Sequence, residues 1–270
     1  MTQRQTFKLL PNRRVGIDAI AADSAIRFGR HTHDQFGIGL MERGGHKSSS
    51  GRGAVEAWPG DIITVNPGEV HDGAPIGQAG RAWRMLYVEP SIVAEISLDI
   101  SGDRCGHTEF TRPVVRDKPL AFRFRQLFDS MAGAAPGRLK LDEGLVLLLA
   151  PLVRPGRINR AESPGVPSAM QSARAMIDDD PAAAVSLADL AQEAGLSRYQ
   201  FLRRFAQLTG LTPHAYLVQR RVQLARRLIR KGTKSAEAAA TAGFADQSHM
   251  TRAFVRTFGL TPGACASSST

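Results

Sequence analysis

The chain has 270 residues, a net charge of +10 and two cysteines. Its longest apolar run, at residues 145–153, is far shorter than the roughly 20 residues that span a membrane. The N-terminus lacks the apolar core of a secretory signal, so we expect a cytoplasmic protein with no membrane partner. Cys105 and Cys265 lie far apart without metal-type spacing, which predicts two reduced thiols and excludes a disulfide framework.

Residues 15–90 alternate short apolar runs with turn signals such as "WPGD" and "NPGEVHDG", which predicts an antiparallel β-barrel or sandwich. Two helices are expected at about 119–153. The first, "PLAFRFRQLFDSMAG", carries its apolar residues largely on one stripe, and the second, "RLKLDEGLVLLLAPLV", is apolar on more than one face. The second helix must therefore pack on the barrel, on its neighbour or on a second copy of the chain. We expect this pair to mediate dimerisation.

The composition changes at residues 156–168, where prolines and glycines break any regular pattern and predict an interdomain linker. We therefore expect one domain at 1–155 and a second at 169–265. The positive charge is denser on the second side: residues 168–270 hold 13 Lys or Arg against 7 Asp or Glu, whereas residues 1–167 hold 22 against 18. This distribution favours a polyanionic partner for the C-terminal domain.

The C-terminal part reads as helices with short breaks, and it repeats itself. "AGLSRYQFLRRFAQLTGLTP" at 194–213 returns as "AGFADQSHMTRAFVRTFGLTP" at 242–262. Each copy predicts a short helix, a tight turn at Gly195 or Gly243 and a second helix, which is the layout of a helix-turn-helix. We expect Ser186 and Ser197 to cap the first two helices. The repeated core consists of Leu187, Leu190, Ala191, Leu196, Phe201 and Phe205 in the first copy and of Ala236, Ala239, Ala240, Phe244, Met250 and Phe254 in the second.

The outer faces of the two copies differ, as expected if they read different base edges of one duplex. The candidate DNA-binding residues are Ser197, Arg198, Tyr199, Leu202 and Arg203 in the first copy and Gln247, Ser248, Thr251 and Arg252 in the second. Arginine can form a bidentate pair with guanine, glutamine with adenine, and the threonine methyl can contact thymine. The helix between the copies is roughly 25 Å long, which suits the spacing of successive major grooves. Some of its arginines are expected to face phosphates.

The stretch "LSRYQFLRRFAQLTGLTPHAYLVQRRVQLARRLI", followed by "AAATAGFADQSHMTRAFVRTFGLTP", closely resembles the DNA-binding domain of the AraC/XylS family of bacterial transcription regulators. The resemblance implies a seven-helix domain with two such motifs that binds double-stranded operator DNA. RNA polymerase is implied as a further partner if the protein is an activator. The final residues, "GACASSST", depart from the family because they lack the basic last helix often seen there.

Two N-terminal motifs, "RHTHDQFGIGLMERGG" and "WPGDIITVNPGEVHDG", look like those of a cupin barrel, as found in the ligand-binding domain of the same family. His31 and His33, two apart on a strand, point to the same side, and a turn before His71 brings it alongside them. Three histidines suit zinc, iron or nickel, but metal-binding cupins supply a glutamate where this chain has Gly37 and Ile38. The histidines therefore line a small-molecule pocket, hold a divalent metal, or make structural hydrogen bonds; the first needs no cofactor.

Trp83, Arg84 and Tyr87 could add an aromatic wall and a cation for an anionic effector, although the two aromatic residues also fit an ordinary barrel core. The sequence thus indicates an α+β protein of two domains, an N-terminal cupin-like antiparallel β-barrel with helices and a C-terminal all-α double helix-turn-helix. We expect a dimeric transcription regulator whose small-molecule effector shifts a population between DNA-competent and incompetent arrangements. The alternative is a metal-dependent cupin enzyme fused to a DNA-binding domain.

Overall fold

The computed structural model describes residues 6–10, 15–101, 108–132, 138–155 and 168–266. The chain divides into two compact units, residues 1–159 and 160–270. The predicted linker at 156–168 lies, apart from its last residue, outside the described residues, so the domain boundaries at 155 and 169 stay a prediction. No helix within the described ranges is long and apolar enough to cross a membrane.

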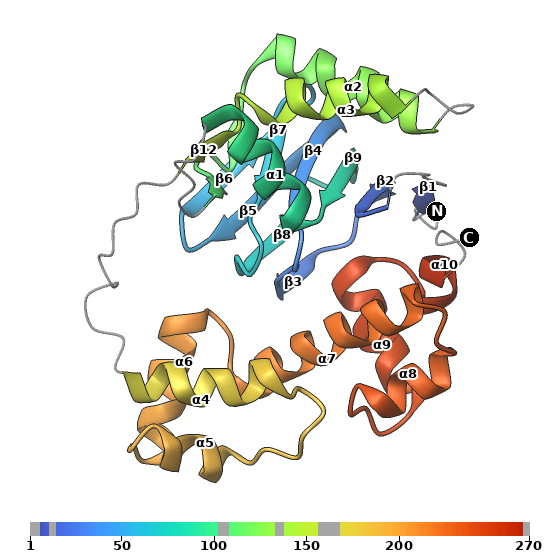
Figure 1. Cartoon of the computed structure of the whole chain (residues 1–270). Coiled ribbons are helices and arrows are strands. Elements are labelled where there is room, and N and C mark those ends of the chain that lie inside the picture. The colour runs from blue at the N-terminus through green and yellow to red at the C-terminus, as the bar shows by residue number, and fades with distance from the viewer. Residues whose placement is uncertain (1–5, 11–14, 102–107, 133–137, 156–167, 267–270) are drawn as a thin grey trace. The chain divides into compact units, whose positions relative to one another are not determined.

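The N-terminal unit contains the predicted barrel, built from two antiparallel sheets (Figure 1). The larger sheet consists, in spatial order, of β1 (Thr6–Leu10), β2 (Ile17–Ser24), β9 (Arg81–Val88), β4 (Phe36–Arg43), β7 (Ile62–Val65) and β11 (Val114–Val115). The smaller sheet consists of β3 (Phe28–His31), β8 (His71–Ile76), β5 (Gly45–Ser50) and β6 (Gly53–Ala57). Two short strands, β10 (Thr108–Phe110) and β12 (Val153–Pro155), pair separately.

Three helices, α1 (Pro90–Ser101), α2 (Lys118–Ala132) and α3 (Arg138–Leu149), complete this unit, and α2 and α3 cover the larger sheet (Figure 1). The alternation along β4 places Ile38 and Leu40 in one core with Phe124 and Phe128 of α2. Burying each such side chain stabilises the fold by about 1.5–3 kcal/mol. Packing within the chain explains only part of the apolar composition of α3: Leu141, Leu145, Leu148 and Leu149 share this core, whereas Leu139, Val146 and Leu147 are exposed.

The other face of β4 points into the barrel, and there the chain has glycines. A Cβ on Gly39 would collide with the Met85 sulfur, and one on Gly37 would lie 2.8 Å from the Met85 methyl carbon and 3.4 Å from the Tyr87 ring. These positions are small because side chains of β9 fill the interior opposite them.

The C-terminal unit is all-helical within the described residues. It consists of α4 (Ser168–Asp179), α5 (Leu187–Glu193), α6 (Arg198–Thr209), α7 (Pro213–Arg230), α8 (Ser235–Thr241), α9 (Gln247–Phe258) and α10 (Pro262–Ala266). The short final helix α10 carries no basic side chain, and Cys265 on it is buried and forms no disulfide with a described residue. Cys105 lies outside the described residues.

The predicted helix boundaries rest on caps that the structure confirms. Ser186 and Ser197 are the N-caps of α5 and α6, each in a capping box completed by the side chain of Asp189 or Gln200. The turns that follow α5 and α8 contain Gly195 at φ +62° and Gly243 at φ +79°, a left-handed backbone that favours glycine.

The core of the second motif differs from the prediction at two positions. Ala236 and Ala240 are exposed, and Ala238 and Ala242 are buried instead. The reason is the register of the repeat: an offset of 48 residues aligns the first helix and turn of the two motifs, so that Ala238 and Ala242 occupy the places of Leu190 and Ala194. The remaining predicted core residues of this motif, Ala239, Phe244, Met250 and Phe254, are buried. In the first motif Leu190, Ala191, Phe201 and Phe205 are buried, and Leu187 and Leu196 are half-buried.

Candidate DNA-binding face and effector pocket

The exposed face of α6 carries most of the candidate DNA-binding residues of the first motif. Ser197, Arg198, Tyr199 and Arg203 are all exposed, and the Arg203 guanidinium lies 5.9 Å from the centre of the Tyr199 ring. Tyr199 is 67% exposed, so this large ring is presented to a partner rather than used in the core. Leu202 is only half-buried and lines an apolar groove of about 410 Å³ bordered by α4, α5 and α7.

The corresponding face of α9 has the same layout with different chemistry. Gln247, Ser248 and Arg252 are exposed, and Thr251 is half-buried. The first turn of α9 is capped by Asp246, whose carboxylate accepts a hydrogen bond of 2.6 Å from the His249 backbone N–H. An anion therefore already occupies this helix N-terminus, so the prediction that both helix N-termini hold phosphate is better suited to α6, whose cap is the neutral Ser197.

A single helix, α7, joins the two motifs and belongs to the cores of both. Near its start Tyr216 packs against Phe205 of α6 with ring centres 5.5 Å apart, and near its end Val222 and Ile229 share a cluster with α8 and α9. A carboxylate of α4 fixes the first half: Asp178 accepts 2.7 Å from the Tyr216 hydroxyl and pairs with Arg220 at 2.9 Å. With 18 residues α7 is about 27 Å long.

The arginines of α7 serve two purposes. Arg220 pairs with Asp178, Arg221 donates to the carbonyls of Pro181 and Ala183, and Arg226 is buried against the Phe258 ring, so all three hold the domain together. Arg227 and Lys231, at the end of the helix, are exposed. Of the α7 cations that were expected to face DNA, the remaining candidates are therefore those at this end of the helix.

In the N-terminal unit the three predicted histidines come together. The ring centres of His31 and His71 lie 4.4 Å apart and those of His31 and His33 lie 4.9 Å apart. One ligand atom from each lies within 4.8 Å of the others. The prediction placed His31 and His33 on the same strand, but β3 ends at His31 and His33 lies beyond it. The His33 carbonyl accepts a hydrogen bond of 2.7 Å from the backbone N–H of Gly68. The β3–β8 pairing places His31 opposite His71.

Hydrogen bonds of these rings favour a defined tautomer. Nδ1 of His31 lies 2.7 Å from the Gly29 carbonyl and Nδ1 of His71 lies 3.0 Å from the Glu69 carbonyl, so each Nδ1–H donates and each Nε2 keeps its lone pair. Burial, together with the neighbouring His71, lowers the pKa of His31 to about 3, and burial also lowers the pKa of His71. Neutral imidazoles oriented by carbonyls are the form that binds zinc and similar ions, so these residues fit such an ion.

The three predicted residues of β9 separate onto two faces. Tyr87 lies beside His33, with ring centres 4.9 Å apart, and Trp83 lies on the same face of the strand, against Phe28. Arg84 is on the opposite face, where it pairs with Glu42 at 2.7 Å and with Asp129 of α2 at 2.6 Å. The structure therefore does not bring Arg84 to the histidines, and its predicted role as the cation of the pocket has no geometric support.

Two other basic residues lie in the barrel interior. Neither was predicted from the sequence. Arg81 lies two residues before Trp83 and is 1% exposed, and its guanidinium lies 4.8 Å from the Trp83 ring centre. His46 of β5 lies close to Arg81, and burial, together with Arg81 and His71, lowers the pKa of His46 to about 3. The alternation of side chains along a strand could have identified Arg81, because it places Arg81 on the same face of β9 as Trp83 and Tyr87.

A barrel lined by histidine and aromatic side chains, on one chain with two helix-turn-helix motifs, defines a DNA-binding regulator that carries its own ligand-binding domain. Residues 14–149 match the family described as AraC-like ligand binding domain, and residues 190–267 match a helix-turn-helix domain. The chain belongs to the AraC family of transcription regulators.

Relatives and solved structures agree with this assignment. The chain is 30% identical over 227 residues to the uncharacterized HTH-type transcriptional regulator YbfI of Bacillus subtilis (strain 168), covering 83% of this chain and 82% of that protein. It is 39% identical over 89 residues to the HTH-type transcriptional activator RhaS of Escherichia fergusonii, covering 33% of this chain and 32% of that protein. The crystal structure of apo ToxT K231A from Vibrio cholerae has the same fold, with a TM-score of 0.60 at 12% identity over 96% of this chain and 100% of that chain.

Proposed function

We propose that this protein is a cytoplasmic regulator that reads operator DNA by placing α6 and α9 in successive major grooves on one side of the duplex. The observation that carries this proposal is that α7 contributes to the cores of both motifs. The two exposed faces are therefore held at a fixed spacing, and a helix of about 27 Å plus the width of the motifs approaches the ~34 Å pitch of B-DNA.

In this proposal the two helices recognise different bases. Arg203 and Arg252 each form a bidentate pair with guanine, and Gln247 pairs with adenine. Thr251 and Leu202 make apolar contacts, and the remaining candidates, Ser197, Arg198, Tyr199 and Ser248, contact the backbone or bases beside them. Seven of these nine residues are exposed, all except the half-buried Leu202 and Thr251, and this exposure supports the division.

The experiment that tests the proposal is a selection of bound duplexes from a random library with the full-length protein. We expect an enriched site with two half-sites about 10 base pairs apart. Inserting five base pairs, roughly half a helical turn, between the half-sites should reduce affinity to the non-specific level, because α7 cannot rotate one motif to the other face of the DNA. Unchanged affinity after the insertion would contradict the proposal.

The effector in this proposal is a small molecule bound without turnover inside the barrel, beside His31, His33, His71, Trp83 and Tyr87. Solved ToxT structures hold an unsaturated fatty acid and a naphthyl butenoic acid, which supports a small-molecule site in this fold. A thermal-shift screen of metabolites against the full-length protein finds the ligand, and a gel-shift titration then measures its effect. A ligand that stabilises the protein without changing its affinity for operator DNA would contradict the coupling.

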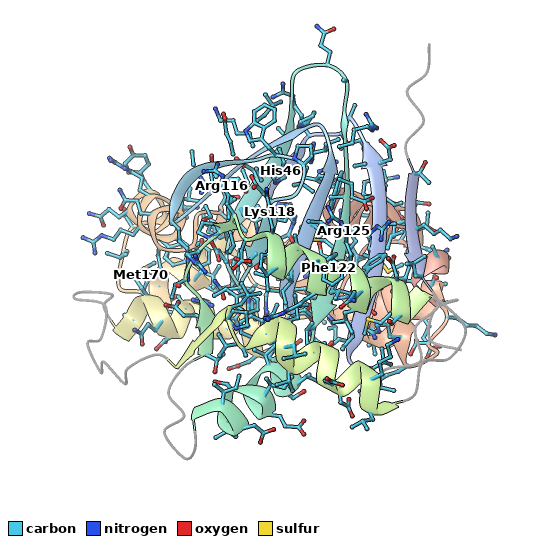
Figure 2. All side chains as sticks on the ribbon, turned by 90° about the horizontal axis from the view of Figure 1, so that it is seen from above. His46, Arg116, Lys118, Phe122, Arg125 and Met170 are labelled. Atoms are coloured by element: carbon cyan, nitrogen blue, oxygen red, sulfur yellow. The ribbon has the colours of Figure 1, made fainter. Side chains whose placement is uncertain are left out.

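We further propose that α2 and α3 form a homodimer contact. Phe122 is 57% exposed and Leu139 is 81% exposed on these helices, and Val146 and Leu147 extend the apolar surface (Figure 2 labels Phe122 on α2). Phe122→Glu should convert a dimer to a monomer in sedimentation experiments, whereas Arg125→Glu, a charge change on the same helix, serves as control. RNA polymerase is a partner if the protein activates transcription.

A divalent metal ion is a second candidate for what the barrel binds, favoured by the carbonyl-oriented tautomers of His31 and His71. The three histidines would supply three nitrogen ligands and leave coordination positions of the ion open, so that the ion could also contact an effector. Dialysis of the full-length protein against zinc, followed by metal analysis, should give about one ion per chain. His33→Ala should abolish retention, and His214→Ala, an exposed histidine of α7, should not. Equal retention by both variants would contradict this candidate.

A further inference from the structure

Arg81 is a buried cation that no acidic side chain neutralises. Its side chain is 1% exposed, and it forms no ion pair with any described residue. Within the part of the chain that the structure describes, its one hydrogen bond runs from Nη1 to the Ile26 carbonyl at 3.1 Å, and Nε is buried without a partner. A desolvated guanidinium is costly unless an anion compensates it, and buried arginines are almost always paired.

The rings around Arg81 orient the guanidinium but do not neutralise it. The Trp83 ring centre lies 4.8 Å and the Phe28 ring centre 6.0 Å from the guanidinium carbon. Such cation–π contacts offset part of the desolvation cost and keep the planar group in one orientation. The hydrogen-bond donors that the rings leave unused remain available to a ligand.

The carboxylates on neighbouring strand positions are engaged elsewhere. Asp23, next to the partner of Arg81 on β2, pairs with Arg43 at 2.6 Å. Asp72 on β8 accepts a hydrogen bond of 2.6 Å from the Ser49 backbone N–H. Among the described residues, Arg81 therefore has two aromatic neighbours but no counter-ion.

His46 extends the same site from another strand. Its Nδ1 is buried without a hydrogen-bond partner (Figure 2 labels His46). A Cβ on Gly73 of β8 would lie 3.1 Å from His46 Cε1 and 3.6 Å from Arg81 Nη2, so both side chains converge on the spot where β8 has no side chain. Gly73 has no left-handed backbone that would require glycine, and its missing Cβ leaves room for the His46 ring beside the Arg81 guanidinium.

We propose that Arg81 and His46, beside Gly73, form an anion-binding subsite inside the barrel that takes the carboxylate or phosphate group of the effector. This inference rests on the proposed function of the barrel as the effector pocket. The planar guanidinium presents parallel N–H groups that match either anion, and His46 adds one further N–H donor. The aromatic rings of Trp83 and Phe28 then bound the less polar part of the ligand.

The test measures the melting temperature of the full-length protein with three probes: inorganic phosphate, propionate and the neutral propionamide, at constant ionic strength. At about five times its dissociation constant, a bound anion should raise the Tm by roughly 2–4 °C, and propionamide should not. The more effective of phosphate and propionate identifies the anion class. Absence of a saturable effect of both anions would overturn the proposal.

Variants separate an anion site from a structural arginine. Arg81→Met removes the unpaired charge, so the protein without anion should melt no lower than wild type, and the anion-dependent rise should disappear. Arg43→Met, which removes an exposed arginine of the same unit, should retain the full rise. An undiminished rise in Arg81→Met overturns the proposal. If Arg81→Met does not fold, Arg81→Lys decides: a weakened rise supports the site, and an unchanged rise overturns it.

The anion site and the proposed function can fail separately. Gel shifts of Arg81→Met without probe should match those of wild type, because Arg81 belongs to the N-terminal unit and to neither helix-turn-helix motif. Loss of the anion response with intact DNA binding supports the subsite. If the protein bound DNA without requiring two half-sites, that result would count against the proposed DNA recognition by α6 and α9. The anion measurement would remain valid.

Discussion

Replacing Gly195 or Gly243 by alanine makes the same change at equivalent turns of the two helix-turn-helix motifs, yet the structure implies unequal costs. Both residues have positive φ, +62° and +79°. A methyl group in the left-handed region costs about 1–2 kcal/mol. At Gly195 a Cβ meets nothing within 4 Å, so we expect this backbone cost to be the whole loss of stability in Gly195→Ala.

Gly243 carries an additional constraint, because a Cβ there would lie 2.9 Å from both the Cα and the carbonyl oxygen of Ala182. That backbone cannot yield easily, since Arg221 donates to the carbonyls on either side of it, those of Pro181 and Ala183. Overpacking against fixed backbone adds about 1–3 kcal/mol. The total for Gly243→Ala is therefore about 2–5 kcal/mol.

Urea unfolding of the full-length protein, followed by circular dichroism of its helices, measures both free energies. Gly263→Ala, at a glycine of α10 without positive φ and with open space around it, is the matched control and should cost little. Equal losses for the two turn variants, or a larger loss at Gly195, would refute the reasoning from Ala182. Operator affinity should fall more for Gly243→Ala, because the displaced loop connects α4 to α5.

Three further outcomes are expected. Arg203→Ala and Arg252→Ala should each cost about 1–3 kcal/mol of specific binding and relax preference at one base pair in a selection experiment; a uniform loss over all sequences would make them phosphate contacts. Tyr216→Phe should destabilise the C-terminal unit by about 1–2 kcal/mol in urea, since its hydroxyl bond to Asp178 is lost, and no change would show that this bond is dispensable. Arg84→Ala should cost about 1 kcal/mol or less and leave effector binding unchanged in a thermal-shift titration, because its ion pairs are partly exposed; loss of effector binding would restore its predicted role.

Much of the C-terminal unit could be predicted from sequence because its signals are local. A serine three residues before an acidic or amide side chain defines a capping box, and a glycine after a short helix defines a left-handed turn. These features placed α5 and α6 correctly at Ser186 and Ser197. The alanine-rich α8 was harder, because alanine fits either face and only the repeat offset distinguishes Ala238 from Ala236.

The barrel could be predicted only in part, because its site depends on contacts between residues distant in sequence. The motif spacing was sufficient to bring His31, His33 and His71 together, since His31 ends β3, His33 follows it and His71 begins the paired strand β8. The choice between Arg81 and Arg84 as the interior cation depended on which face of β9 turns inward. That choice is made by α2, which supplies Asp129 to Arg84, and by Phe28, which packs beside Arg81.

The sequence by itself determined the two helix-turn-helix motifs, the caps of the first motif and most of the residues on their outer faces, because hydrogen bonds within a few residues and a period of 3.6 are sufficient for them. Tertiary structure alone decided which basic side chains of the barrel are buried without an acid and how tightly each glycine turn is packed. Those properties depend on contacts between residues distant in sequence, so Arg81 and Gly243 acquire their constraints only when β5, β8 and the loop at Ala182 are in place.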